Sequence, residues 1–590
     1  MRKIKQKDFD HIAEYIIEER KRRKKNRSDL EKIWKQLDRQ VEMRPDISHK
    51  CFPDSNTRDP QKAWLPEFEL PLQAEALETL MSDTREMMFP SNGTWFSAHA
   101  AVTDEYLAEA DFTSIITGDE NEIPSQITQD NADKLAGGFI DNFHGQYDFR
   151  GHIDLINAEV FTYGTGIGRA RTISKELLMN TAKGLIQEKR KFPVLVPRSI
   201  KETYLDDRLN IVMHEGYMAG PLTIFERRMA YDDLKDIIKK GNRDPESENG
   251  GWYPPNFESV EKDNNGMVDL VEAEGDFIIP RKTTGSIVLP GTIVTVVCGK
   301  NNPQLIRIRF RKHTNSVIPF SYHREKINNP YATSPLIKGW PLQAAAVEML
   351  SRVVESAALK TQPPVGYDRS DLFFAAQGGP GIFPGAVWGT IGELIVHDKF
   401  GDPASLYTIY QGILDQYADV VGMHRARLGA QTLSHTTAYA KEVELQRGAV
   451  RTVDYVRSAL AGPMTQWLSM EYQMGLDSVK GEYTFYIDAY RGFVTIERKH
   501  LPEQVVFEAH GAGTPSEELR KKQEKMASLQ LAIQMDQAAI QAGNPPTLNM
   551  PGLIQDTLRD GGWVDTDPYI NRGNMNQMPA APMMEEAGMM

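Results

Sequence analysis

The sequence contains almost no cysteine. Cys51 and Cys298 are its two cysteines, they lie far apart, and neither belongs to a C-x-x-C pair. A disulfide framework needs several cysteines, and a structural zinc site needs four Cys or His ligands at short intervals. The count therefore excludes both, and we interpret the two residues as reduced thiols in a reducing compartment.

Long apolar runs are missing as well. No stretch approaches the roughly 18 consecutive apolar residues of a membrane span, and the basic start MRKIKQK is not followed by the apolar region of a secretory signal. We therefore expect no membrane partner, and assembly in an aqueous, reducing compartment.

Motifs of catalysis and nucleotide binding are also absent. The chain contains no GxxxxGK[ST], no HExxH and no GxSxG, which are the signatures of P-loop ATPases, zinc proteases and serine hydrolases. His424 and His435 lie 11 residues apart, too far for the i,i+4 pair of a helical metal site. No pair of carboxylates stands out as an acid and base. We expect no enzyme activity, no cofactor and no metal.

Charge is unevenly distributed. The net charge is −13, yet residues 1–50 carry 16 Lys/Arg and 10 Asp/Glu, so the remaining chain is strongly acidic. A protein that grips duplex DNA should present a basic face. An acidic protein repels phosphate, which suits a surface that DNA slides past without arrest. The basic segment Arg20–Lys25 is either a solvated helix turn or a contact for acidic partners or nucleic acid.

The chain of 590 residues exceeds the roughly 250–300 residues of a single core, so it forms several domains or one elongated, subdivided subunit. Apolar residues at three- and four-residue spacing predict helices, and β-branched alternating segments predict strands. On these patterns we expect helices over 8–43, 72–88, 99–116 and 127–160, and a strand-rich region over 192–320.

Two segments resemble ligand-binding loops. The cluster Gly164–Gly168 looks like a phosphate loop, but it follows a predicted helix, whereas a dinucleotide fingerprint follows a strand. We therefore favour a helix-to-strand turn over nucleotide binding. Residues Glu261–Glu272 match much of the spacing of a calcium loop, but they lack flanking helices. A turn built on Asn264-Asn265-Gly266 is the favoured interpretation.

Two amphipathic helices bracket a segment of different character. Residues 341–362 and 405–423 each carry an apolar stripe. The stripe of the first helix contains Leu342, Ala346, Leu350, Val353 and Ala357, and that of the second contains Leu406, Ile409, Ile413, Tyr417 and Val420. The intervening residues 363–404 contain eight Gly and five Pro, which indicates a compact insert.

The C-terminal part is predicted from similar signals. Residues 424–438 are polar, and a long helix follows over about 437–475, kinked if Gly462-Pro463 breaks it. We expect strands over Tyr483–Ile496 and Val505–Ala509, and a helix from Thr514-Pro515 to about Ala542. Residues 545–590 are rich in Pro and Met without periodicity, and we expect them to be mostly disordered.

Residues Ile318–Leu468 resemble the portal, or head-to-tail connector, proteins of tailed bacteriophages, especially the short-tailed podovirus type. The resemblance begins with Ile318-Pro319-Phe320, the segment NPYATSP at 329–335 and Pro341-Leu342-Gln343. It continues in the order of elements, which is helix, insert, helix, polar loop and long helix. By motif it covers about a quarter of the chain, and by element order most of it.

The resemblance implies an α+β, predominantly helical fold: an elongated subunit with wing, stem, clip and crown that forms a ring around a central channel. The implied domains are an N-terminal helix and wing at 1–340, a stem helix at 341–362, a clip at 363–404, a second stem helix at 405–423, a tunnel loop at 424–438, a long wing helix at 439–476, a crown at 477–545 and a tail at 546–590.

The resemblance also implies a function and partners. The chain would form a homo-oligomeric ring, a dodecamer as the resemblance implies, at one capsid vertex of the virion after assembly in the host cytoplasm. Double-stranded DNA would pass through it without sequence specificity during packaging and ejection. Further implied partners are the terminase packaging motor, the major capsid and scaffolding proteins, and the tail adaptor.

Candidate residues follow from the implied domains. The tunnel loop would face DNA with Arg425, Arg427, Gln431, Thr432, Ser434, His435 and Thr436, unless it is an ordinary surface loop. The clip would dock the motor and the adaptor with Phe373, Phe374, Phe383 and Trp388, unless these aromatics form the insert's own small core. Two alternatives to a portal remain: another virion structural protein, such as a tail adaptor or shell-associated protein, and a nucleotide-binding enzyme using Gly164–Gly168.

Overall fold

A computed structural model describes most of the chain, which divides into two compact units. The first unit comprises Met1–Arg85 and Ser97–Ala509, and the second comprises Glu86–Phe96 and His510–Met590. The residues whose structure is described are 8–43, 70–89, 95–102, 129–181, 184–206, 222–246, 250–280, 286–299, 302–310, 316–324, 329–363, 365–368, 387–390, 395–396, 403–423, 451–479, 481–487 and 492–510.

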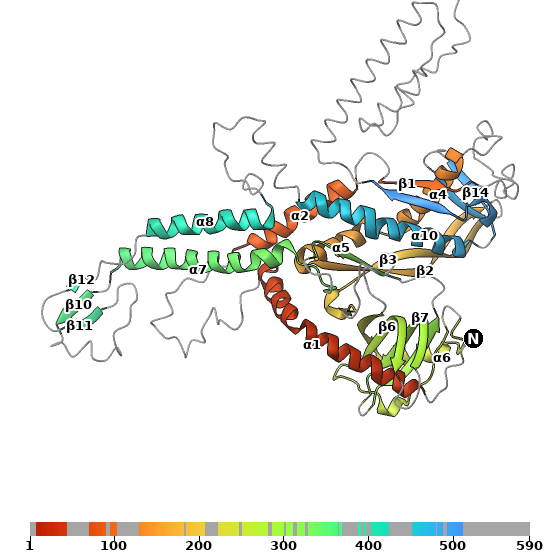
Figure 1. The fold of residues 1–590 in the computed structure, drawn as a ribbon, viewed down its shortest axis with the longest axis horizontal. Coiled ribbons are helices and arrows are strands. Elements are labelled where there is room, and N and C mark those ends of the chain that lie inside the picture. The colour runs from red at the N-terminus through yellow and green to blue at the C-terminus, as the bar shows by residue number, and fades with distance from the viewer. Residues whose placement is uncertain are drawn as a thin grey trace, which may run out of the picture. The chain divides into compact units, whose positions relative to one another are not determined.

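Helices and strands are mixed along the chain, so the fold is α+β, as expected (Figure 1). The α-helices are α1 (Phe9–Val41), α2 (Leu72–Met88), α4 (Gln129–Gln146), α5 (Phe149–Tyr163), α6 (Tyr231–Lys240), α7 (Pro335–Thr361), α8 (Pro403–Val421) and α10 (Thr465–Ser478). The strands are β1 (Phe96–Ala100), β2 (Thr165–Thr181), β3 (Gly184–Arg198), β4 (Thr203–Tyr204), β5 (Leu222–Ala230), β6 (Met267–Pro280), β7 (Ser286–Val297), β8 (Gln304–Phe310), β9 (Val317–Ser321), β10 (Val365–Asp368), β11 (Val387–Thr390), β12 (Ile395–Val396), β13 (Tyr483–Ile487), β14 (Gly492–Ile496) and β15 (Val505–Ala509).

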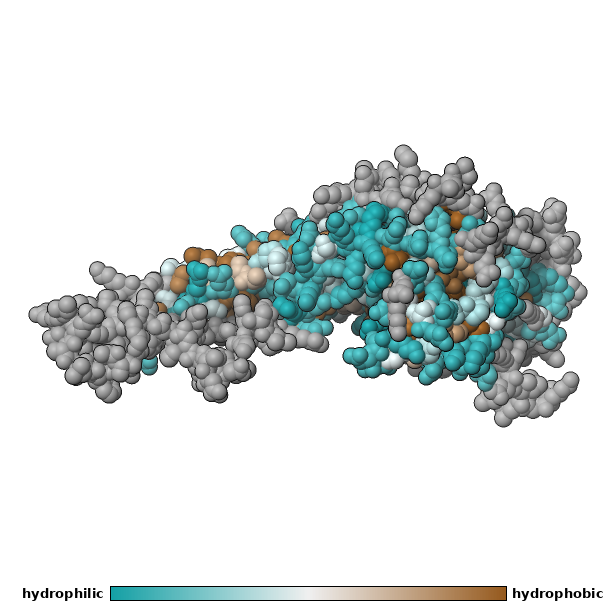
Figure 2. Space-filling model, turned by 90° about the horizontal axis from the view of Figure 1, so that it is seen from below, coloured by the Kyte–Doolittle hydropathy of each residue, from teal (hydrophilic) through white to brown (hydrophobic). Residues whose placement is uncertain are grey.

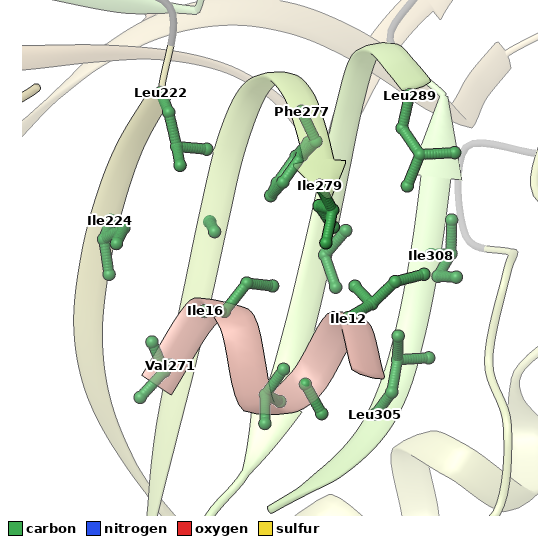
Figure 3. Packing of buried hydrophobic residues seen from close by; sticks show 14 of the residues in the cluster. Ile12, Ile16, Leu222, Ile224, Val271, Phe277, Ile279, Leu289, Leu305 and Ile308 are labelled. Atoms are coloured by element: carbon green, nitrogen blue, oxygen red, sulfur yellow. The ribbon is translucent and has the colours of Figure 1, made fainter. Parts of the chain in front are cut away.

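A five-stranded antiparallel sheet has the order β4-β5-β6-β7-β8. Apolar residues occupy alternate positions of its strands and therefore point to the same face of the sheet. There they form a hydrophobic core with Ile12 and Ile16 of α1, which covers this face (Figure 3). On the other face, Leu234 and Ile238 of α6 join a second apolar cluster. The region 192–320 is strand-rich as predicted, but α6 within it was not predicted, although Leu234 and Ile238 have the i,i+4 spacing of a helix.

A second sheet has the order β3-β2-β9, and its main part is the long antiparallel ribbon of β2 and β3. Helix α5 packs against this ribbon. The strand-rich region was expected to begin at residue 192. In the structure, the first strand of this ribbon, β2, already begins at Thr165. Arg169, Arg171 and Lys175 lie on one face of β2. Because these positions are charged, the alternation of apolar and polar residues that predicts a strand is lost there.

Two predicted helices differ from the structure. The stretch 99–116 was expected to be helical, but its first residues belong to strand β1, which pairs with β15. The stretch 127–160 was expected to be one helix, but it forms α4 and α5. The break occurs because Asp148 caps α5: its Oδ1 accepts a hydrogen bond of 3.0 Å from the Gly151 amide.

The glycine cluster at 164–168 is a helix-to-strand turn, as favoured from the sequence. Gly164 ends α5 with a left-handed φ of 89°, and β2 begins at the next residue. A Cβ on Gly164 would lie 2.0 Å from the carbonyl oxygen of Ala332, and one on Gly166 would lie 2.4 Å from that of Ile156. The glycines therefore allow close backbone packing.

The segment Glu261–Glu272 contains a turn, and the calcium-loop alternative is wrong. Asp263 Oδ1 accepts hydrogen bonds from the amides of Asn265 and Met267, at 2.9 and 2.8 Å. Gly266 takes a φ of 72°, and β6 follows directly. Glu272, which would be the twelfth ligand, lies in β6 and forms an ion pair with Arg169.

The basic segment of α1 divides between the interior and the surface. Arg20 pairs with Glu226, and buried Arg23 donates a 2.7 Å hydrogen bond to the carbonyl of Leu222. Lys24 and Lys25 are exposed. From the sequence, this segment was interpreted as a solvated turn or as a contact for other molecules. In the structure, Arg20 and Arg23 instead bond α1 to strand β5 of the same chain.

The C-terminal elements follow the predictions where they are described. The long helix expected over 437–475 is described from residue 451 and ends with α10 at Ser478. A π-helical turn, Leu460–Met464, interrupts it at Pro463, because proline cannot donate to the helical ladder. The predicted strands appear as β13, β14 and β15. The expected helix from Thr514 and the expected disordered tail lie outside the described residues.

Replacing Gly164 with Ala should lower the free energy of unfolding by about 2 kcal/mol or more, since alanine strains a left-handed φ and its methyl group meets Ala332. Thermal or denaturant unfolding measures the change. Gly137→Ala in α4, where a Cβ meets no atom within 4 Å, is the matched control and should be neutral or slightly stabilising. A fully stable Gly164→Ala variant would contradict this packing.

A candidate assembly surface on a helical hairpin

Helices α7 and α8 form an antiparallel hairpin (Figure 1). They correspond to the helices predicted over 341–362 and 405–423, but α7 begins six residues earlier, at Pro335. Ser334 caps it: the Ser334 Oγ accepts a 2.9 Å hydrogen bond from the Ile337 amide and donates one of 2.9 Å to the carbonyl of Thr162. Pro335 suits the first helical position because its missing amide hydrogen needs no partner there.

The base of the hairpin is held by buried polar groups that connect α7 and α8 to the start of α2. Gln73 donates from its backbone amide to Gln343 Oε1 at 2.9 Å, and Gln343 Nε2 donates to the carbonyl of Leu70 at 2.8 Å. The Tyr417 hydroxyl donates to the carbonyl of Leu72 at 2.9 Å. Buried polar groups need partners, so these bonds favour one arrangement of the three helices.

The two helices of the hairpin pack closely at Gly339. A Cβ there would lie 2.8 Å from Val421 Cγ2 and 2.9 Å from Tyr417 Cε2. The absence of a side chain lets α8 approach the backbone of α7 at this level. Burial raises the pKa of Tyr417, and Glu75 adds to the effect. The hydroxyl therefore stays protonated and remains a hydrogen-bond donor.

Further along the hairpin, apolar side chains are exposed. Val354 of α7 is 36% exposed, and Tyr407 and Ile409 of α8 are 50% and 51% exposed. Figure 2 shows hydrophobic side chains gathered over these helices. We call Val354, Tyr407 and Ile409 the hairpin patch. Val354 lies on α7, and Tyr407 and Ile409, two positions apart on α8, project from different sides of that helix. Apolar side chains are therefore exposed on more than one side of the hairpin, which is typical of an element that contacts other chains.

The predicted apolar stripes are only partly buried. Ala346 of α7 and Tyr417 of α8 are buried, as the stripes require. Ile409 was placed on the stripe of the second helix, but more than half of its surface is exposed. The remaining stripe residues have intermediate exposure: Leu342, Leu350, Val353, Ala357, Leu406, Ile413 and Val420. The hairpin thus covers only part of its own apolar surface.

The residues predicted to contact DNA or to dock partners are not placed by the structure. The candidates of the loop at 424–438 all lie outside the described residues: Arg425, Arg427, Gln431, Thr432, Ser434, His435 and Thr436. Phe373, Phe374 and Phe383 lie outside them too. Trp388 belongs to β11, of which only the backbone is described. Strand β10 pairs with β11 and β12 within the insert.

The described residues hold neither a metal-ion cluster nor a helix that could span a membrane. Within the described part of the chain, no three His, Cys, Asp or Glu side chains gather as a metal ion would require. None of the described helices is both long and apolar enough to cross a membrane. A search of protein-family models found none that matches this chain, and a search of curated proteins found no match.

Sequence reasoning missed the residues that anchor the hairpin. Gln73 and Gln343 are separated by 270 residues, and a lone glutamine in a helix is usually a surface residue. The one available signal was Gln343, which interrupts an apolar helix between Leu342 and Ala344. A polar residue in such a setting is either exposed or buried with a partner.

Replacing Tyr417 with Phe should destabilise the protein by about 1–2 kcal/mol, because the carbonyl of Leu72 loses a buried donor. Chemical denaturation measures the loss. Tyr407→Phe is the matched control: Tyr407 lies on the same helix with an exposed ring, so its hydroxyl should contribute little. Equal effects of both variants would show that the buried hydrogen bond does not stabilise the hairpin.

Proposed function

We propose that this chain is the subunit of a phage portal, a ring at one capsid vertex through which the viral genome is packaged and later ejected. The support is the order of elements around the hairpin. Helices α7 and α8 bracket the Gly/Pro-rich insert, a polar segment follows, and a long interrupted helix comes next. The resemblance stated from the sequence has the same order: stem, clip, stem, tunnel loop and wing helix.

The observation that carries the proposal is the hairpin patch. Burial of apolar surface contributes about 25 cal/mol per Å², so exposed Val354, Tyr407 and Ile409 favour association. In a closed ring, each subunit would present the patch to a neighbouring copy, and every hairpin would be covered. An isolated subunit would leave these side chains in water.

The charge of the chain supports DNA conduction and not DNA capture. A net charge of −13 disfavours the counterion release that drives tight, sequence-independent binding to DNA. The proposed ring is a non-enzymatic channel. Its partners are the packaging motor, the tail adaptor and the capsid and scaffolding proteins, and its location is the virion.

The double variant Tyr407→Ser/Ile409→Asp should abolish ring formation while leaving the monomer folded, since it replaces exposed apolar groups with polar ones. Mass photometry and electron microscopy of the purified chain measure assembly, and circular dichroism checks the fold. Val506→Asp is the control, because Val506 is 65% exposed but lies on β15. Monomers or dimers of the unaltered chain over a wide concentration range would overturn the proposal.

Replacing Arg425 and Arg427 with Ala should leave ring assembly intact and impair the retention or translocation of DNA. The reason is that twelve copies of two arginines would line a channel with positive charge that touches phosphates transiently. Packaging assays with assembled procapsids measure the effect. Loss of assembly in this variant would show that the two arginines are structural, and normal packaging would remove them from the channel.

A further inference from the structure

An arginine-rich layer lies between the β2–β3 ribbon and the five-stranded sheet. On the ribbon, Arg169 and Arg171 alternate with outward residues, and Arg198 pairs with Ile167, so these three arginines share one face. On the sheet, the cross-strand partners Glu272, Thr295 and Arg307 share one face, and Glu274 and Arg309, each two positions further along its strand, lie on the same face. The members of the layer are Arg169, Arg171, Arg198, Arg227, Arg307, Arg309, Glu272 and Glu274.

Ion pairs connect the two faces. Arg169, which is 3% exposed, pairs with Glu272 and, at 2.7 Å, with Glu274. Arg171 Nη2 lies 3.3 Å from the same Glu272 oxygen. The other oxygen of Glu274 accepts a 3.1 Å hydrogen bond from the amide of Ser316. The two carboxylates are therefore already engaged by the inner arginines and by the backbone.

Positive charge exceeds negative charge in this layer. Four arginines of the described residues lie near one another, Arg169, Arg171, Arg198 and Arg227, and the carboxylates near them are Glu272, Glu274 and Glu202. Burial and the charge of Arg169 lower the pKa of Arg171 to about 10. Burial and the charge of Arg309 lower that of Arg307 to about 10. Burial is the larger cause of both shifts in pKa, and the neighbouring arginine adds to it in each case.

Buried polar atoms of the layer have no partner among the described residues. They are Arg169 Nε, Arg198 Nε, Thr223 Oγ1 and Thr295 Oγ1. Thr223 is the cross-strand partner of Glu274, and Thr295 is that of Glu272, so both threonines lie on the sheet face that carries the glutamates. More than nine in ten buried polar groups in proteins are hydrogen-bonded. Thr223 on β5 and Thr295 on β7 lie on opposite sides of β6, so one acceptor cannot serve both hydroxyls. The neighbouring guanidinium groups of Arg169 and Arg198 on the ribbon are the ones that point to an additional acceptor.

We propose that this layer is a binding site for a phosphate group. A phosphate offers several acceptor oxygens and about two negative charges, which would match the unpartnered donors and offset the excess of arginine charge. Guanidinium groups are the preferred partners of such oxyanions because their parallel N–H bonds fit two oxygens at once. Bound phosphate would fasten the ribbon to the sheet, since both contribute arginines.

The site differs from the proposed DNA channel in its location and its chemistry. It lies on β2, β3 and the strands of the five-stranded sheet, whereas the channel candidates lie at 424–438. The inference therefore does not depend on portal function. A phosphate group also occurs in nucleic acid, so free phosphate and DNA are separate arms of the test.

The test measures the thermal unfolding of the full chain and calorimetric binding with increasing inorganic phosphate, at constant ionic strength maintained with chloride. We expect a saturating rise in Tm, as for any ligand that binds only the folded state. Arg198→Gln should weaken phosphate binding about tenfold or more, equivalent to the loss of about 1.4 kcal/mol. Without phosphate it should unfold at the same temperature as the unaltered chain or higher, because one of the repelling cations is gone.

Arg227→Gln and Arg228→Gln form a matched pair. Arg227 is the cross-strand partner of Leu270 on the layer's face of the sheet, whereas Arg228 bonds Asp269 at 2.9 Å. Only Arg227→Gln should weaken phosphate binding, and it provides the test if Arg198→Gln fails to fold. No phosphate-dependent rise in Tm, or equal loss in both variants, would overturn the proposal. Stabilisation by a short DNA duplex but not by phosphate would overturn it as well.

Discussion

The meeting of α2, α7 and α8 is the constraint on which the candidate surface depends. Three side chains from distant parts of the chain, Gln73, Gln343 and Tyr417, satisfy one another and the backbone at the hairpin's base. Leaving any of these groups without a partner inside the protein would cost free energy. The base is thereby fixed, and the exposed apolar side chains further along α7 and α8 are presented in a defined geometry.

Much of the element order could be predicted from the sequence. The helices over 8–43 and 72–88, the hairpin helices and the strand at Val505–Ala509 all follow from apolar periodicity, and the structure confirms them. The start of the β2–β3 ribbon could not be predicted, because Arg169 and Arg171 occupy inward positions of β2. Their burial depends on ion pairs with β6, and no local pattern specifies a partner about 100 residues away. The hairpin anchor was missed for the same reason.

Arginine and lysine have different roles in this chain, and the difference decides how its basic segments are interpreted. On α1, Arg23 and Arg27 are buried and donate to backbone carbonyls of Leu222 and Thr203. The guanidinium of Arg27 also lies 4.1 Å from the ring centre of Tyr204. Several donors in one plane allow such burial, whereas the compact ammonium of lysine keeps its water. A count of positive charges alone therefore overstates the charge that α1 offers to other molecules.

The cap of α7 gives the hairpin a mechanical connection to the rest of its unit. Ser334 bonds the last turn of α5 through Thr162, and the amide of Ala332 bonds Thr165 at the first residue of β2. With Gly164 packed against the same segment, the start of α7 cannot shift without breaking contacts to both α5 and β2. A ligand or neighbouring molecule that tilts α7 would therefore also displace α5 and strand β2, and through β2 it would strain the β3-β2-β9 sheet.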